Sequence, residues 1–295
     1  AKLVFPGPAL DGKSVYELIE SEKVTFAAGV PTVWQMLLGH MKPEKLRFSS
    51  LNRTVIGGSA CPPAMIDAFK EDYGVDVLHA WGMTETSPIG TMGAPTPDWD
   101  DLTLEQQIDI VCKQGRTPFG VELRVIDKDG NVAPRDGVTS GALQIRGPWV
   151  IKRYFKADAD AVDADQWFDT GDVSVLHPDG TMQITDRVKD VIKSGGEWIS
   201  SVELENIAVG CPGIAEAGAI GVPHPKWDER PVLITVKKPG AEVDEAAVKA
   251  YLAERIVKWW MPDRVLFVDE LPHTGTGKIQ KVALRAQFKD FVLED

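Results

Sequence analysis

Apolar and polar positions between residues 14 and 80 alternate in a way that predicts helices and strands in turn. A helix is expected at Ser14, where Glu17 completes a capping box, with Val15, Leu18 and Ile19 on its apolar face. Apolar runs at 24–30, 54–57 and 75–80 predict buried strands. Further helices are expected at 33–38 and from Cys61-Pro62-Pro63 to Gly74. This order of elements predicts a parallel sheet.

The pattern changes after about residue 116. Short alternating segments are joined there by Asp-Gly dipeptides, at 129–130 and 179–180. Asp-Gly between alternating apolar residues is a hairpin signal, so we expect an antiparallel, barrel-like section. Residues 91–115, which separate the two patterns, are expected to form a surface excursion with one acidic helical stretch.

A third pattern follows Asp190. Ser200 and Glu203 fit a capping box, and Asp244 is expected to begin a helix with Val248, Tyr251, Leu252 and Ile256 on one face. We therefore predict two domains. Residues 1–188 form the first, α/β over 1–90 and mainly antiparallel β over 91–188, and residues 189–295 form a small α+β domain.

Composition narrows the function classes. The net charge is −12 over 295 residues without a basic run, so a nucleic-acid partner is not expected. Three widely spaced cysteines predict reduced, structural thiols and a cytoplasmic protein rather than a disulfide scaffold. No stretch of the sequence predicts a membrane span or a signal peptide.

Four motifs occur in a fixed order: W-G-M-T-E-T (81–86), F-D-T-G-D (168–172), D-R-V-K-D-V-I-K-S-G-G-E-W (186–198) and P-H-T-G-T-G-K-I (272–279). Together they resemble the acyl-adenylate-forming enzymes, and residues 194–206 and 224–231 are most similar to fatty acyl-CoA synthetases. The resemblance implies a large domain with a parallel sheet and a barrel-like part, followed by a small α+β domain. Because the family's Ser/Thr/Gly-rich phosphate loop has no counterpart in residues 1–295, we expect the C-terminal part of a longer ligase.

The resemblance assigns the phosphates and adenine of ATP to the first motif and to a glycine turn upstream of it. Glu85 is the expected Mg²⁺ ligand, since a carboxylate beside bound phosphates shares a hard cation with them. Thr84 would bond a phosphate oxygen, and Trp81 would offer a flat face to adenine. The rest of this nucleotide-binding set is Gly57, Gly58, Ser59, Ala60 and Gly82. Taken alone, each of these short patterns is more often an ordinary turn.

The later motifs supply the other predicted contacts. Asp172 and Arg187 would bond the ribose, because a carboxylate accepts from both hydroxyls and a guanidinium adds donors. Lys278 would reach the α-phosphate and the substrate carboxylate. Gly195 and Gly196 would let the pantetheine arm of CoA pass, and Lys189 would be the hinge between two presentations of the small domain. The remaining cofactor-binding candidates are Lys193, Glu197 and Trp198.

The predicted reaction joins a carboxylic acid to CoA by way of an acyl-AMP intermediate, with ATP and Mg²⁺ as cofactors. A medium- or long-chain fatty acid is the expected substrate, and a short or thioether acid such as methylmercaptopropionate is the alternative. A nonenzymatic nucleotide-binding remnant and transfer to a carrier protein are the other hypotheses. His79 either borders the acyl pocket or is simply packed. The resemblance also allows a homodimer through the family's N-terminal half.

Overall fold

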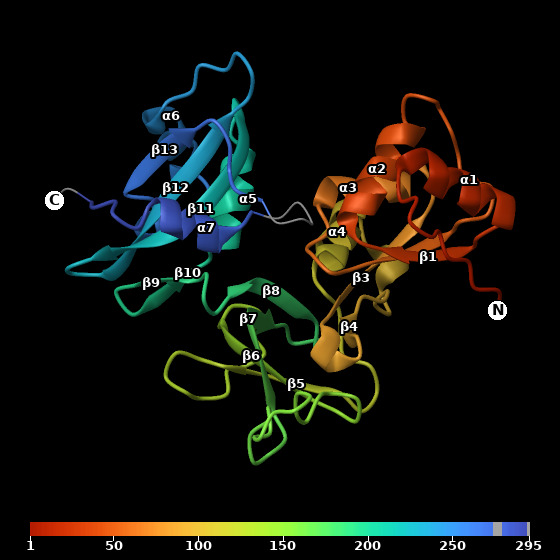
Figure 1. Ribbon diagram of the computed structural model, residues 1–295, viewed down its shortest axis with the longest axis horizontal. Helices are drawn as coiled ribbons and strands as arrows, with labels where there is room; N and C mark the ends of the chain where they lie inside the picture. Colours follow the sequence, from red (N-terminus) through yellow and green to blue (C-terminus); the bar gives the residue numbers. More distant parts are fainter. Residues whose placement is uncertain (274–278, 294–295) are drawn as a thin grey trace. The chain divides into compact units, whose positions relative to one another are not determined.

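The structure is a computed structural model, and it describes residues 1–273 and 279–293. The chain divides into two compact units (Figure 1). Unit 1 comprises residues 1–170 and 175–184, and unit 2 comprises residues 171–174 and 185–295. Residues 184 and 185 thus mark the main change between units, and the domain boundary predicted at 188/189 stays a prediction.

The first half of unit 1 is an α/β layer. Its sheet has the order β1-β2-β3-β4, with β1 to β3 parallel and β4 antiparallel to β3. The strands are β1 (Phe26–Gly29), β2 (Arg53–Ile56), β3 (Asp76–Gly82) and β4 (Ile89–Met92). The helices are α1 (Gly12–Glu22), α2 (Pro31–Met41), α3 (Pro63–Asp67), which a π-helical turn (Ala68–Asp72) continues, and α4 (Leu104–Cys112). The predicted parallel sheet is confirmed.

The apolar residues that repeat with helical or strand spacing meet in one core. Leu37, Met41, Ile56 and Phe69 are fully buried there, so α2, β2 and the turn after α3 pack through them. The start predicted for α1 is wrong by three residues. Asp11 caps the helix, because its carboxylate accepts from both the backbone N–H and the hydroxyl of Ser14.

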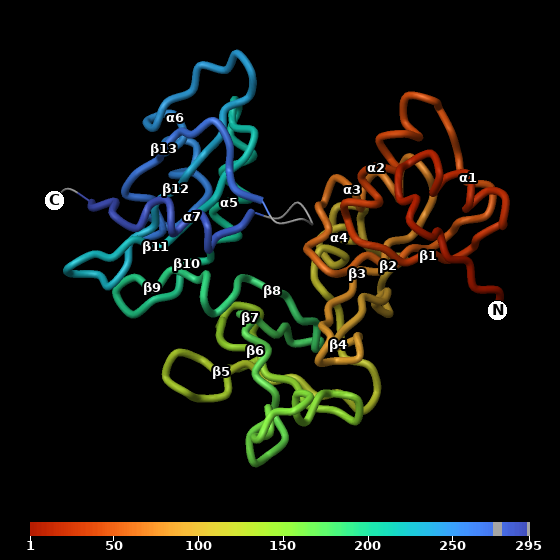
Figure 2. The backbone as a smooth tube through the Cα atoms, in the orientation of Figure 1, coloured from red at the N-terminus to blue at the C-terminus, as the bar shows by residue number. Residues whose placement is uncertain are grey.

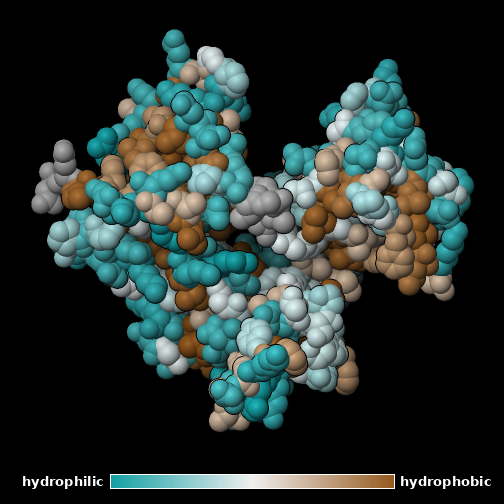
Figure 3. Space-filling model, in the orientation of Figure 1, coloured by the Kyte–Doolittle hydropathy of each residue, from teal (hydrophilic) through white to brown (hydrophobic). Residues whose placement is uncertain are grey.

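Apolar side chains also remain exposed beside α1 and β1 (Figure 3). Phe26 on edge strand β1 keeps 48% of its surface accessible, and Phe5 near the N-terminus keeps 81%. Arg53 of the neighbouring strand covers part of Phe26, with its guanidinium carbon 5.8 Å from the ring centroid.

The second half of unit 1 belongs to a four-stranded sheet of order β5-β6-β7-β8. Its strands are β5 (Glu122–Ile126), β6 (Gly141–Arg146), β7 (Phe168–Leu176) and β8 (Met182–Arg187). The predicted turns form: Gly130 and Gly180 adopt φ of +85°, the left-handed conformation that glycine enters at little cost. Strands β7 and β8 contribute residues to both units, and Figure 2 traces their path.

Unit 2 is a five-stranded sheet with helices on both faces. The strands are β9 (Ile192–Ser194), β10 (Glu197–Ile199), β11 (Ile214–His224), β12 (Asp228–Lys237) and β13 (Arg264–Val268). They run β10-β9-β12-β11, and β13 joins β12 in parallel. The helices are α5 (Ser201–Val209), α6 (Glu245–Ala253) and α7 (Lys281–Gln287). The predicted α6 start at Asp244 is confirmed, because that side chain accepts from the N–H of Ala247.

Alternation along β12 explains why both faces of this sheet are covered. Leu233 packs into the core with α5 and α6, whereas Val232 and Ile234 pack into a second core that includes Leu284 of α7. The central strand is therefore apolar on both sides. Within the described residues no helix is long and apolar enough to cross a membrane. All three cysteines are free, as predicted.

Candidate functional site

The glycine turn and the first motif lie at the ends of two neighbouring strands of unit 1. Strands β2 and β3 are parallel and pair Ile56 with His79, so Gly57 and Trp81 emerge from the same edge of the sheet. A Cβ on Gly57 would lie 3.0 Å from the carbonyl oxygen of Ala80, and Gly58 adopts φ of +80°. Open α/β sheets bind ligands at this kind of edge. The structure thus brings the predicted Gly57–Ala60 and Trp81–Glu85 segments together.

Glu85 lies in a short 3₁₀ turn (Thr84–Thr86) that is firmly anchored. The buried Thr86 hydroxyl accepts from the N–H of Met83 at 2.9 Å and donates to the Pro88 carbonyl at 2.7 Å. The Glu85 carbonyl accepts from the N–H of Ile151 at 2.8 Å. Thr84 is exposed and Glu85 half-buried, so both side chains can reach a ligand.

Tyr154 is a candidate site residue that the sequence interpretation missed. Its hydroxyl donates to Oε1 of Glu85 at 2.8 Å, and this hydrogen bond to the carboxylate raises the pKa of Tyr154. The two residues are 69 positions apart, and no local pattern links them. Tyr154 fixes one carboxylate oxygen of Glu85, and the second oxygen can still face a cation.

Two glycines shape the position of Trp81. A Cβ on Gly90 would lie 2.2 Å from the Trp81 ring, so the ring rests directly on that backbone. A Cβ on Gly82 would lie only 1.7 Å from the Pro88 carbonyl oxygen. Tight chain packing therefore requires glycine at position 82 whether or not a nucleotide binds there.

His79 is tightly packed in the fold, and whether it also borders an acyl pocket stays a prediction. It is 1% exposed, and its Nδ1 lies 3.1 Å from the carbonyl oxygens of both Val111 and Cys112. Because carbonyls only accept, Nδ1 carries the hydrogen, and Nε2 is left to accept from the N–H of Cys61 at 3.4 Å. Burial lowers the pKa of His79, and the hydrogen bonds to the carbonyl groups of Val111 and Cys112 oppose that effect.

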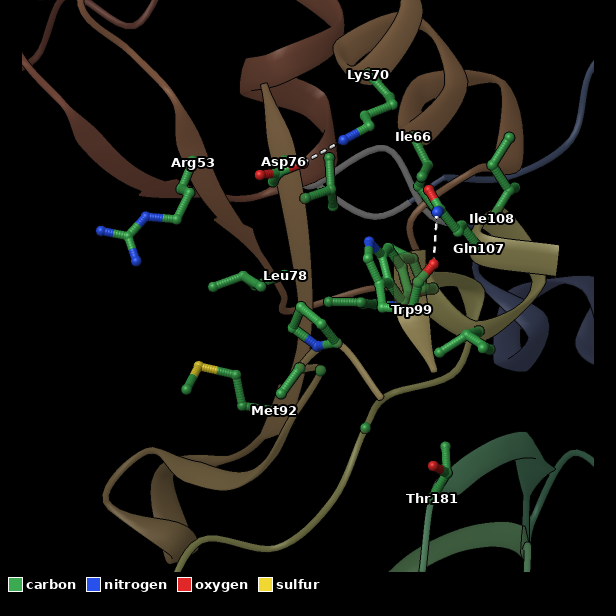
Figure 4. A pocket seen from close by; sticks show the side chains of 18 of the residues that line it. Arg53, Ile66, Lys70, Asp76, Leu78, Met92, Trp99, Gln107, Ile108 and Thr181 are labelled. Atoms are coloured by element: carbon green, nitrogen blue, oxygen red, sulfur yellow. Dashed lines mark hydrogen bonds and ion pairs between the residues drawn. The ribbon is translucent and has the colours of Figure 1, made fainter. Parts of the chain in front are cut away.

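A cavity of about 310 Å³ lies beside the first half of β3 and under α4 (Figure 4). Ile66, Leu78, Trp99 and Ile108 give it an apolar lining. Among the lining residues, Lys70 donates to Asp76 at 2.7 Å, and Gln107 donates to the Trp99 carbonyl at 2.9 Å. The polar side chains of the lining are thus largely paired with each other. The remaining walls are apolar and suit an apolar ligand group.

The predicted ribose residues meet within unit 2. Nε of Arg187 lies 3.5 Å from Oδ1 of Asp172, and the Arg187 side chain is 60% exposed. The N–H of Val188 donates to the Gly171 carbonyl at 3.0 Å, so the two strand ends are held side by side. The exposed guanidinium can turn toward a ligand, whereas the Asp172 side chain is 14% exposed.

Gly195 and Gly196 form the two-residue turn between β9 and β10. Their φ angles are +60° and +83°, and the N–H of Gly195 donates to the Trp227 carbonyl at 2.8 Å. A two-residue hairpin turn with two positive φ angles favours glycine whether or not CoA passes beside it. A Cβ on Gly196 would meet nothing within 4 Å, so the turn also presents open space. Beside it, Lys193 and Glu197 are exposed and Trp198 is half-buried.

The last two predicted residues are Lys189 and Lys278. Lys189 is exposed, and its carbonyl oxygen accepts from Nη2 of Arg285 at 2.7 Å. Lys278 lies outside the described residues. Among residues 1–273 and 279–293, no three His, Cys, Asp or Glu side chains gather in a way that could hold a metal ion by themselves.

Two family models match this chain. The AMP-binding enzyme model matches residues 1–155, and the AMP-binding enzyme C-terminal domain model matches residues 203–278. The chain belongs to the AMP-binding enzyme family. The resemblance and the mixed α/β fold class predicted from the sequence are confirmed.

Relatives within the AMP-binding enzyme family extend along nearly the whole chain. The 3-methylmercaptopropionyl-CoA ligase of Ruegeria lacuscaerulensis is 54% identical over 98% of this chain and 54% of its own length. The medium-chain-fatty-acid–CoA ligase of Ectopseudomonas oleovorans is 50% identical over 99% of this chain and 54% of its own length. The crystal structure of ATP-bound MatB from Rhodopseudomonas palustris has a TM-score of 0.77 at 28% identity, over 95% of this chain and 54% of that one. The chain thus spans about half the length of the curated relatives it matches.

The matched segments divide the site residues into three groups. The Gly57–Ala60 turn, the Trp81–Glu85 motif and Tyr154 fall in the AMP-binding match, and Lys278 is the last residue of the C-terminal match. Asp172, Arg187, Lys189 and the Gly195–Gly196 turn fall between the two. The role of each residue remains a prediction.

Proposed function

We propose that this chain acts within an ATP-dependent acid–thiol ligase that makes acyl-CoA. The observation that carries the proposal is the meeting of the Gly57–Ala60 turn with the Trp81–Glu85 motif, where Tyr154 fixes the Glu85 carboxylate. In the first step a substrate carboxylate attacks the α-phosphorus of ATP, and pyrophosphate leaves. In the second step the CoA thiol attacks the acyl carbon, and AMP leaves with the proton lost from sulfur.

The division of tasks follows from the chemistry of each side chain. Glu85 would share Mg²⁺ with the nucleotide phosphates, since that ion usually takes one or two carboxylates and completes its shell with phosphates and water. Asp172 and Arg187 would hold the ribose, and Lys278 would neutralise charge that develops at the α-phosphate. The Gly195–Gly196 turn would border the path of CoA.

The acid is proposed to be a medium- or long-chain fatty acid. The apolar cavity beside β3 supports this, because its walls suit methylene groups, and His79 at its edge lies two residues before Trp81. The alternative, a short thioether acid, is supported by the 54% identity to the 3-methylmercaptopropionyl-CoA ligase. Comparing octanoate with 3-methylmercaptopropionate as substrates decides between them. The variant Ile108→Trp, which fills the cavity, should depress octanoate use more than use of the shorter acid.

A chimera tests the proposed reaction directly. In it, residues 1–295 replace the matched portion of the Ruegeria lacuscaerulensis ligase, so that the relative supplies the upstream part. The chimera should form acyl-CoA from ATP, CoA and one of the two acids. Residues 1–295 alone contain no Ser/Thr/Gly-rich phosphate loop, and we expect them to retain AMP but to release no pyrophosphate from ATP. A chimera that folds and yet makes neither acyl-adenylate nor thioester contradicts the proposal.

We further propose that Lys189 is the hinge of unit 2. Arg285 binds the Lys189 carbonyl and also Oδ1 of Asp190, so the peptide bond after Lys189 is braced. Trypsin should cut there slowly and release a fragment of roughly 11 kDa, as at a linker between packed domains. Arg285→Ala should speed this cut, whereas Arg255→Ala, which removes an arginine that binds a carbonyl in the same unit, should not. If trypsin instead cleaves faster within residues 200–260, the hinge does not lie at Lys189.

A further inference from the structure

Arg230 in strand β12 is a largely buried arginine whose N–H groups are all bonded within unit 2. Its side chain is 14% exposed, and Nε and Nη2 donate to the carboxylate of Asp263 at 2.7 to 3.2 Å. Nη2 also donates to the Met261 carbonyl at 3.0 Å, and Nη1 donates to the Trp259 carbonyl at 3.0 Å. The second N–H of Nη1 donates to the hydroxyl oxygen of Ser194 at 3.1 Å. A guanidinium has five N–H groups, so none is left for a ligand.

The bond to Ser194 reaches the base of the turn that the proposed function assigns to CoA. Ser194 is the last residue of β9, directly before Gly195, and it is 5% exposed. Strand β9 is only three residues long, and its register with β12 pairs Ser194 with Asp228. So short a strand gives the turn few backbone hydrogen bonds. Side chains of the neighbouring strand therefore have a large part in holding the turn in place.

The residues on both sides of Ser194 are bonded to the same part of the chain. The N–H of Lys193 donates to Oε2 of Glu229 at 2.8 Å, and the N–H of Gly195 donates to the Trp227 carbonyl at 2.8 Å. A Cβ on Gly195 would lie 2.9 Å from the Trp227 ring, so this ring lies directly against the turn. Three consecutive residues are thus held from the start of β12, and in the middle one the contact is made by a charged side chain.

All of these bonds lie on one side of the proposed hinge. Ser194 and the Gly195–Gly196 turn come after Lys189 in the chain, and Arg230 and Asp263 belong to unit 2 as well. A rotation about Lys189 therefore breaks none of them. The bonds of Arg230 can hold the turn in the same conformation before and after such a rotation.

We propose that Arg230 is a positioning residue for thioester formation. Asp263 and two carbonyls fix its guanidinium, and its bond to Ser194 keeps the base of the Gly195–Gly196 turn against β12, where the turn leaves a path for the pantetheine arm. When the turn adopts this conformation for only a fraction of the time, the apparent affinity for CoA falls by that fraction, and the rate at saturating CoA does not. This inference rests on the proposed function, because it assigns the turn to CoA.

The first test needs no activity. In this chain alone, Ser194→Ala removes one hydroxyl and leaves the other bonds of Arg230 in place, so amide hydrogen exchange should rise at residues 193–197. The matched control is Thr235→Val, which removes another buried hydroxyl of unit 2, one that donates to the Leu266 carbonyl at 3.0 Å. The control should leave exchange at 193–197 unchanged. Unchanged exchange there in Ser194→Ala would overturn the proposal, whatever the enzyme does.

The second test separates the half-reactions in the chimera. Thioester formation from supplied acyl-adenylate reports the second step, and carboxylate-dependent ATP–pyrophosphate exchange reports adenylation. Ser194→Ala should raise KM for CoA about tenfold, as expected for the loss of one hydrogen bond to a charged group, with kcat of the second step changed less than about twofold. Adenylation should also change less than about twofold. Thr235→Val should leave both steps near normal, and equal losses in both half-reactions of Ser194→Ala would contradict the proposal.

Two variants of Arg230 itself distinguish positioning from folding. Arg230→Lys keeps a positive charge beside Asp263 but lacks the planar fork that bonds Asp263 and Ser194 at the same time. Its melting temperature should stay near the wild-type value while KM for CoA rises as in Ser194→Ala. Arg230→Met leaves Asp263 without its partner, so it should lower the melting temperature as well. A normal KM for CoA in Arg230→Lys, or a KM that only follows the melting temperature, would overturn the proposal.

Failure of the proposed function gives a different result. A wild-type chimera that folds but forms no thioester from supplied acyl-adenylate and CoA would count against the proposed function. Amide exchange at residues 193–197 would then still show whether the bond between Arg230 and Ser194 holds the turn.

Discussion

The two units hold their candidate residues by different means. In unit 1 the backbone places the Gly57–Ala60 turn and Trp81, which follow from the ends of adjacent strands and are confined by close chain contacts at Gly82 and Gly90. In unit 2 side chains hold the predicted ribose pair, because Asp172 lies against Arg187. The buried Asp186 carboxylate also accepts from the Ser201 hydroxyl and from the N–H of Arg187. A site that the backbone holds should tolerate a change of side-chain charge but not of side-chain size. A site that charged side chains hold should tolerate a change of size but not of charge.

The largest expected effect separates the two half-reactions. In the chimera, Lys278→Ala should cut adenylation roughly 100- to 1000-fold, the usual loss for one preorganised charge, and spare thioester formation from supplied acyl-adenylate. Gly196→Leu should do the reverse. Its matched control is Gly180→Leu, because Gly180 has a similar φ of +85° and equally open surroundings, so that backbone strain alone is accounted for. If both variants slow both steps alike, the two residues do not serve separate steps.

The next prediction tests how strongly unit 1 depends on side-chain size. Gly82→Ala should lower the free energy of unfolding by about 3 kcal/mol or more, because its Cβ would lie 1.7 Å from the Pro88 carbonyl and backbone must move. Gly39→Ala on helix α2 should instead raise it by about 1 kcal/mol, since a Cβ there meets nothing within 4 Å. Urea titration of residues 1–295 measures both. Equal stability of the two variants would show that the strand end is pliable.

A smaller effect concerns the hydrogen bond that orients Glu85. Tyr154→Phe should lower adenylation by the chimera about tenfold and raise the Mg²⁺ concentration needed for half-maximal rate, because one hydrogen bond to a charged group is lost. Tyr16→Phe is the control, as that hydroxyl donates at 3.0 Å to the Arg47 carbonyl away from the site. A normal Mg²⁺ requirement in Tyr154→Phe would mean that Glu85 is held by its backbone alone.

The smallest effect depends on pH. Burial lowers the pKa of His79 in the folded state from its ordinary value of 6.5. When the pH falls below 6.5, the unfolded chain therefore binds a proton at this residue more readily than the folded chain does. Stability from this group is complete above pH 6.5 and falls as the pH drops, by at most about 1.4 kcal/mol per pH unit. Urea titrations between pH 5 and 7.5 (roughly the range around the unperturbed histidine pKa) measure the slope. His79→Gln should flatten it; the same slope in that variant would assign it to other groups.

The fold was largely predictable because it depends on patterns that lie close together in the sequence. Apolar runs bounded by turn residues gave β1 to β3, and Asp-Gly gave two of the turns. The start of α1 was not predictable, because both Asp11 and Ser14 satisfy the rules for an N-cap. Only the folded backbone shows that Asp11 accepts hydrogen bonds from Ser14. Local patterns fix the existence of an element better than its end.

The site was predictable only where motifs carry it. The Trp81–Glu85 motif and the Gly195–Gly196 turn could be named from the sequence because their spacing is local. Tyr154 could not, since it reaches Glu85 across 69 residues, and neither could Arg285, which donates to the Lys189 carbonyl across 96. Partners of this kind are set by how elements pack, and nothing in the pattern around Tyr154 or Arg285 marks them.

Two of the three cysteines are buried and Cys112 is half-buried, which makes this chain convenient for thiol-directed spectroscopy. Burial raises the pKa of Cys61 to about 12 and that of Cys112 to about 11, and it also raises the pKa of Cys211. Maleimides react with thiolates, and at neutral pH these groups are almost entirely protonated. A thiol introduced at the exposed position Lys189 would be labelled first, with the native cysteines in place. A fluorophore at position 189, with the native cysteines unchanged, would report when Arg285 releases the Lys189–Asp190 segment.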